Sequence, residues 1–209
     1  MKNHLIVLLF ITIACNSKPA LDAEKIKVEL DSIMVQDQLH RSELSALYTE
    51  LGSESEEFQT VLEKQMVIDS SNLVYILDLI NSYGKYPGKS LVGIKSGEVA
   101  FYILQHSPDS IQNKHLQTIL NAAKEGELSK RLAAMFHDRY LLQNDQPQIY
   151  GSQIGTREVF DSFSGQIIRE KFLHPIADTN KIDSLRLWNG LSPLEDYLNS
   201  YGISRWDND

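Results

Sequence analysis

The sequence contains almost no cysteine: Cys15 is the single one among 209 residues. A disulfide framework within the chain is excluded, because it needs an even set of cysteines. A structural zinc site of the usual kind, built from cysteines, is excluded for the same reason. The six histidines contain no HExxH pair. We therefore expect neither a metal site nor a cofactor.

Glycine-rich and nucleophile motifs are also missing. The chain has no Walker-type loop, no GxGxxG and no GxSxG, and the segment 151–155, GSQIG, is too polar and too short to serve as a nucleotide loop. Lysine and arginine number 20 against 28 acidic residues, which gives a net charge of −8 with no basic cluster. Contacts to phosphate backbones need such clusters, so we expect no nucleic-acid partner.

The one marked apolar run is short. It extends from Leu5 to Ile13, well below the roughly 20 residues that span a bilayer. Lys2 precedes it and Ala14-Cys15 follows, an order typical of a secretory signal, and the cysteine resembles that of a bacterial lipobox. We predict a signal peptide at 1–14, a tether at 15–21 lipidated on Cys15, and one globular domain at 22–209. The alternatives are a plain signal peptide with an incidental cysteine, or a buried N-terminal helix.

Such a chain would sit in the bacterial cell envelope, in the periplasm or exposed at the surface. Its partner there would be a membrane, held through the lipid anchor without any spanning segment.

Apolar residues at spacings of three and four predict a mainly helical chain. The longer helices are expected at about 22–51, 69–83, 97–106, 108–125 and 128–142, and shorter ones at 182–189 and 194–201. Between them, the amide-rich segment 146–155 and the segment 159–176 read as extended chain, with Ser164-Gly165 as a hairpin turn. The predicted fold class is α+β, a bundle-like single domain with a small β-hairpin or extended segment near 146–175.

Charged residues occupy several positions where the apolar stripes point inward. The stripe of Ile26, Leu30 and Ile33 continues to Asp37 and Arg41, which lie one turn apart. Similar extrapolation points inward at His106, Arg139 and Asp69. Buried charges need partners, so we expect Asp37, Asp69 and Asp138 to pair with Arg41, Arg139 and His106. Neighbouring amide side chains would bond to the donor and acceptor atoms that these pairs leave without a partner.

Short motifs in this chain resemble, in order, those of an uncharacterised bacterial domain family that often occurs on secreted proteins or lipoproteins. They are DQLHR, IDSSN, YGKYPG, QH, DRY, QIYGSQ and DSLRLWNGLSPLEDYL, spread from about Gln36 to Tyr197. Tyr86 and Ser152 stand where that family tends to have Trp and Thr. The resemblance implies that the polar positions belong together, and it implies no activity. The pattern falls on Asp37, Gln38, Arg41, Asp69, Asn72, Tyr83, Gly84, Pro87, Gln105, His106, Asp138, Arg139, Gln148, Tyr150, Gly151, Gln153, Arg186, Gly190 and Leu191.

The inward polar residues permit two interpretations: a buried network that fixes helix register, or a cleft that binds a ligand. The candidate ligand-binding residues are Asp37, Gln38, Arg41, Asp69, Asn72, Gln105, His106, Asp138, Arg139, Gln148, Tyr150 and Gln153. Arginines would hold a carboxylate or phosphate, and the amides would bind a small molecule, a sugar or a peptide.

Three functions therefore remain open. The first is a ligand-binding module of an envelope lipoprotein. The second is a hydrolase of an envelope polymer, with His106 as general acid or base and Asp138 or Asp37 as its partner. The third is a structural or protein-interaction module.

Overall fold

The N-terminal part of the fold is a layer of three helices, α1 (Ala23–Gln38), α2 (Arg41–Leu51) and α3 (Glu56–Tyr83). The computed structural model describes residues 21–203, so the predicted signal peptide and Cys15 lie outside the described part. The helix predicted at 22–51 is wrong in one respect, because it breaks at Leu39-His40. Gln65 of α3 fills the break: its amide accepts from the His40 N–H (3.3 Å) and donates to the Asp37 carbonyl (3.1 Å).

The prediction that the second helix begins near Asp69 is also wrong. The helix α3 begins at Glu56, where the Ser55 hydroxyl accepts from the Phe58 N–H, and it ends at Tyr83, which Gly84 follows with φ of 82°. Ser70 is tolerated in the middle because its hydroxyl bonds back to the Met66 carbonyl (2.8 Å). A polar run therefore marked the interior of a long helix rather than its start.

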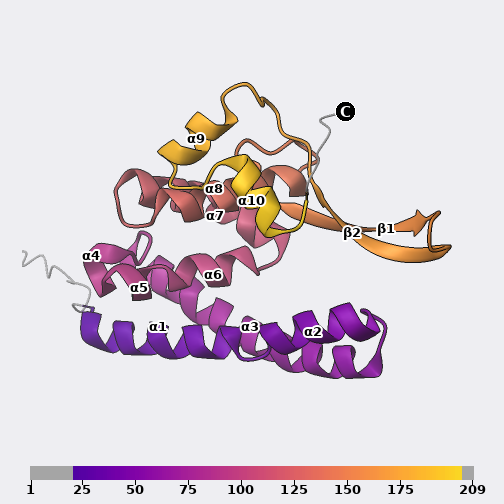
Figure 1. The fold of residues 1–209 in the computed structure, drawn as a ribbon. Coiled ribbons are helices and arrows are strands. Elements are labelled where there is room, and N and C mark those ends of the chain that lie inside the picture. The colour runs from indigo at the N-terminus through magenta and orange to yellow at the C-terminus, as the bar shows by residue number, and fades with distance from the viewer. Residues whose placement is uncertain (1–20, 204–209) are drawn as a thin grey trace, which may run out of the picture.

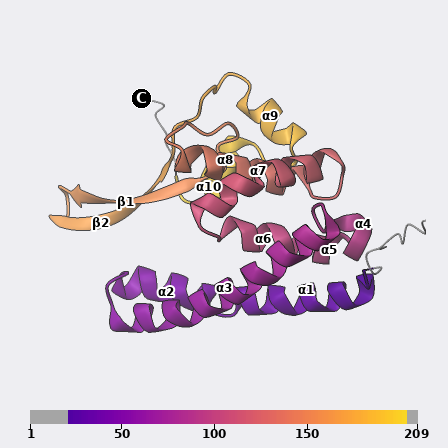
Figure 2. The same ribbon diagram turned by 180° about the vertical axis from the view of Figure 1, so that it is seen from behind.

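A second set of helices stacks on the first. It comprises α4 (Lys89–Val92), α5 (Ile94–Gly97), α6 (Val99–Gln105), α7 (Asp109–Lys124) and α8 (Lys130–Gln143). Figures 1 and 2 show α6 between the α1–α3 layer and the α7–α8 pair. The main core lies between these layers and contains fully buried residues such as Leu30, Ile76, Phe101, Leu104 and Phe136. The apolar stripes predicted for these helices do face this core.

The extended region forms one antiparallel hairpin, β1 (Ile154–Asp161) with β2 (Gln166–Leu173). Its turn contains Gly165 at φ of 69°, as the Ser-Gly pair predicts. In both views the hairpin projects away from the helical body (Figures 1 and 2). It still contacts the first layer, because Arg169 Nη1 donates to the Tyr48 carbonyl (2.8 Å). Residues 146–153 form a loop, with one bridge between Gln148 and Ile176.

The chain closes with two short helices, α9 (Ile182–Trp188) and α10 (Leu194–Ser200). They cover a small second core of Ile176, Ile182, Leu194, Leu198 and Ile203. The fold is therefore α+β and mainly helical, which confirms the predicted class. Among residues 21–203, no helix combines the length and the apolar character that a membrane span requires.

Candidate functional site

The polar residues expected to form one cluster form two separate groups. The first, here called the groove group, gathers at the ends of α1 and α6 and the middle of α3. The second, here called the loop group, surrounds the loop 148–152 beside α8. The groove group consists of Asp37, Gln38, Arg41, Gln65, Asp69 and His106, and the loop group of Asp138, Gln148, Ser152, Gln153 and Arg186.

Asp37 is the centre of the groove group. Its side chain is 1 % exposed, and Arg41 Nη2 donates to its Oδ1 at 2.9 Å. The Gln38 amide donates to Oδ2 at 2.6 Å, and His106 Nδ1 lies 3.6 Å from Oδ1. Burial raises the pKa of the Asp37 carboxyl, but the contacts with His106 and Arg41 outweigh burial, so the net pKa is lowered. Asp37 is therefore a carboxylate at neutral pH.

Arg41 joins this carboxylate to a second one. The same Nη2 donates to Asp69 Oδ1 at 2.8 Å, and the Gln65 amide donates to that oxygen at 2.7 Å. Gln65 is fully buried and was not among the predicted site residues. The signal that points to it is its place one turn before Asp69, on the inward stripe of α3.

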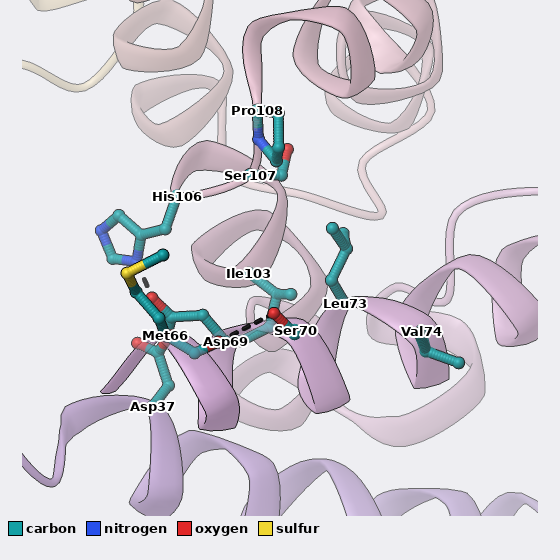
Figure 3. Close-up of a pocket in the computed structure, with 10 residues that line it drawn as sticks. All are labelled: Asp37, Met66, Asp69, Ser70, Leu73, Val74, Ile103, His106, Ser107 and Pro108. Atoms are coloured by element: carbon teal, nitrogen blue, oxygen red, sulfur yellow. Dashed lines mark hydrogen bonds and ion pairs between the residues drawn. The ribbon is translucent and has the colours of Figure 1, made fainter. Parts of the chain in front are cut away.

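Part of the groove group lines one end of a groove of about 520 Å³ (Figure 3), but Gln38, Arg41 and Gln65 are not among its lining residues. Asp37, Asp69 and His106 lie together at its polar end. The rest of the wall is mainly apolar and consists of Met66, Ser70, Leu73, Val74, Ile103, Ser107 and Pro108. The groove lies between the flank of α3 and the segment where α6 ends at Gln105 and the chain continues toward α7.

Asn72, Gln105 and Arg139, which were also predicted, lie outside the groove wall as Gln38 and Arg41 do. Asn72 is buried, and its Nδ2 has no partner among the described residues. Gln105 contributes its backbone carbonyl, which accepts from Arg139 Nη1 at 3.0 Å. Arg139 thus binds a carbonyl rather than the carboxylate that we predicted, and it lines a different hollow with Gln153. Burial lowers the pKa of Arg139.

Asp138 organises the loop group. It is fully buried, and its carboxylate accepts from the N–H groups of Ile149 (2.7 Å), Tyr150 (2.9 Å) and Ser152 (2.9 Å). The Ser152 hydroxyl adds a fourth hydrogen bond at 2.8 Å. The predicted pairing of Asp138 with an arginine or with His106 is therefore wrong. Its oxygens bind the loop backbone, so of the two candidate partners only Asp37 contacts His106.

The predicted amides of this region also serve the backbone. The Gln148 Oε1 accepts from the Gln153 N–H (2.9 Å), and its Nε2 donates to the His174 carbonyl (2.8 Å). The Gln153 amide reaches the Met135 carbonyl of α8 at 3.1 Å. The loop does fold back over α8, as its position after that helix suggests, but its amide side chains secure chain segments.

Arg186 completes the loop group from the opposite side. Its fully buried guanidinium donates to the carbonyls of Tyr150 (2.7 Å), Gly151 (2.9 Å) and Ser192 (2.7 Å). It also lies 4.8 Å from the centre of the Tyr197 ring. Burial lowers its pKa. The loop is thus held between a carboxylate that binds its N–H groups and a guanidinium that binds its carbonyls, which is a structural role.

No group of three histidine, cysteine or acidic side chains in the described part of the chain is arranged to hold a metal ion. The groove instead presents two carboxylates and one imidazole beside a mainly apolar wall, and the Arg41 guanidinium, which does not line the groove, binds both carboxylates.

Comparison with family models matches residues 25–204 to a family of unknown function, DUF6624. The chain therefore belongs to this family. The resemblance of its motifs predicts membership of an uncharacterised domain family, and this is confirmed. Comparisons with curated proteins and with solved structures give no match.

Proposed function

We propose that the groove binds a small ligand, and that the protein is an envelope lipoprotein that presents it. The observation that supports binding is the convergence of Asp37, Asp69 and His106 at one end of a groove of about 520 Å³. Small-molecule sites are typically clefts of this size, with mainly apolar walls and a few polar groups that fix orientation.

The exposure of the wall supports the same function. Met66 is 56 % exposed and Val74 is 61 % exposed, although both line the groove. Large apolar side chains that are left open beside polar groups gain free energy when a ligand covers them. A network that served helix register alone would not need this open wall. The loop group has a structural role of another kind, because its buried Asp138 and Arg186 hold the backbone of the loop 148–152.

The envelope location rests on the N-terminal sequence. If Cys15 carries lipid, only the short tether 15–21 separates the membrane surface from α1, which begins at Ala23. The protein would then hold its groove near the membrane, in the periplasm or at the surface. Mass spectrometry of the mature protein tests this location, because an N-terminus without acyl chains on Cys15 would refute the anchor.

Binding is testable with the neutral fluorescent probe N-phenyl-1-naphthylamine and the purified full chain. We expect one saturable site, and we expect Val74→Arg to weaken binding about tenfold or more, because a charged chain would lie across the apolar wall. The matched control is Val35→Arg on α1, which is 70 % exposed and lines neither the groove nor the hollow beside it. Equal loss in both variants, or in neither, would refute binding in the groove.

A hydrolase of an envelope polymer is the second candidate, favoured by the contact between His106 Nδ1 and Asp37. A carboxylate on one ring nitrogen orients the imidazole and leaves the other nitrogen to accept or deliver a proton. This candidate requires that the protein release soluble fragments from purified bacterial sacculi and that His106→Ala abolish the release. Fragment release that persists in His106→Ala, or no release by the wild type, removes it.

A further inference from the structure

The groove has unequal charge at its polar end. Asp37 and Asp69 contribute two carboxylates, and the one guanidinium between them, that of Arg41, binds both through a single nitrogen. The nearby Glu63 lines an adjoining hollow together with Met66 and Ser70, which both belong to the groove wall. Since Arg41 is already shared by two carboxylates, it is poorly placed to hold an anionic ligand in two-pronged fashion.

The Asp69 carboxylate keeps one oxygen free to accept a hydrogen bond. Asp69 Oδ1 accepts from Arg41 and Gln65, whereas its Oδ2 has no hydrogen-bond partner among residues 21–203. His106 lies beside this pair of carboxylates, with its Nδ1 3.6 Å from Asp37 Oδ1. A ligand group that pairs with Asp69 Oδ2 must donate a hydrogen.

The apolar part of the groove wall determines the chemistry of the rest of the ligand. Leu73 and Val74 of α3, with Ile103 of α6 and Pro108, continue from the polar end (Figure 3). These side chains offer no hydrogen bonds to a ligand, so they favour an aliphatic segment rather than a polar one. We propose that the groove binds an aliphatic ammonium compound, with the protonated amine at the Asp69 carboxylate and the hydrocarbon along Leu73 and Val74.

This inference rests on the proposed binding function, and displacement of the fluorescent probe tests the two separately. Hexylammonium, hexanol and hexanoate share one hydrocarbon length and differ in their head group. We expect hexylammonium to displace the probe at a concentration about tenfold lower than hexanol, because its head forms charge-assisted hydrogen bonds. Hexanoate should be the weakest of the three, since its charge repels the excess carboxylate.

Asp69→Asn should remove most of the advantage of hexylammonium over hexanol, with both compounds compared on the same variant. The matched control is Asp78→Asn, which removes the same charge from an exposed position of α3 outside the groove and should retain the advantage. If hexanoate displaces the probe as well as hexylammonium does, or if both variants behave alike, the ammonium preference is wrong and the groove remains a binding site. If the probe does not bind in the groove, the proposed binding function itself is refuted. The comparison of the three compounds on the wild-type protein tests the ammonium preference even if Asp69→Asn is unstable.

Discussion

Replacing Asp138 by alanine is expected to lower the free energy of unfolding by roughly 3–5 kcal/mol. Three loop N–H groups and the Ser152 hydroxyl donate to this one buried carboxylate. A buried donor that loses its acceptor costs about 1–3 kcal/mol, and water entering the vacated space would recover part of the total. Asp138→Asn should lose less, because the amide keeps one accepting oxygen but turns an N–H₂ group toward the loop donors.

Urea unfolding at pH 7, followed by circular dichroism, measures this effect. Asp78→Ala is the control, since it removes an exposed carboxylate from a helix and should change stability by about 0.5 kcal/mol or less. A loss below about 1 kcal/mol for Asp138→Ala would show that the loop donors are satisfied without the carboxylate.

Replacing Arg186 by methionine is expected to cost roughly 2–4 kcal/mol. Methionine retains much of the apolar stem, but it leaves the carbonyls of Tyr150, Gly151 and Ser192 without their shared donor. Removing a buried cation also relieves its desolvation, which is why the expected loss is smaller than three hydrogen bonds suggest. Arg186→Lys should resemble Arg186→Met, because an ammonium cannot reproduce the planar fork.

Urea unfolding measures both variants, and lysine behaving like the wild type would contradict the role of the fork. The double variant Asp138→Ala, Arg186→Met adds a second criterion. Both changes release the same loop, so their combined loss should fall short of the sum by about 0.5–3 kcal/mol. Strict additivity would mean that the two residues act on independent parts of the structure.

Much of the fold follows from local patterns. Apolar spacing located the bodies of most helices, and the Ser164-Gly165 pair located the hairpin turn. The same reasoning missed the break at Leu39-His40, because the inward stripe continues in phase from Asp37 to Leu44. The amide that fills this break, Gln65, comes from another helix. Periodicity cannot report a contact of that kind, since it describes one segment at a time.

The candidate site was likewise predicted in part by local patterns and in part not. Periodicity predicted that Asp37 and Asp69 turn inward, and both reach the groove group. On the helix α8 the same stripe pointed to Arg139, whereas the structure buries its neighbour Asp138 fully and leaves Arg139 partly exposed. Whether an inward polar residue faces a ligand or the backbone depends on which segments meet it across the fold.

The sequence by itself determined the helical class, the acidic balance, the absence of cysteine chemistry beyond Cys15 and the polar character of the inward positions. Those properties depend on composition and on spacing within single segments. Only the tertiary structure decided that Arg41 joins two carboxylates at an open groove while Asp138 and Arg186 enclose a loop. The partners in both groups lie up to tens of residues apart in the chain, and their distances are fixed by how the layers pack rather than by any local propensity.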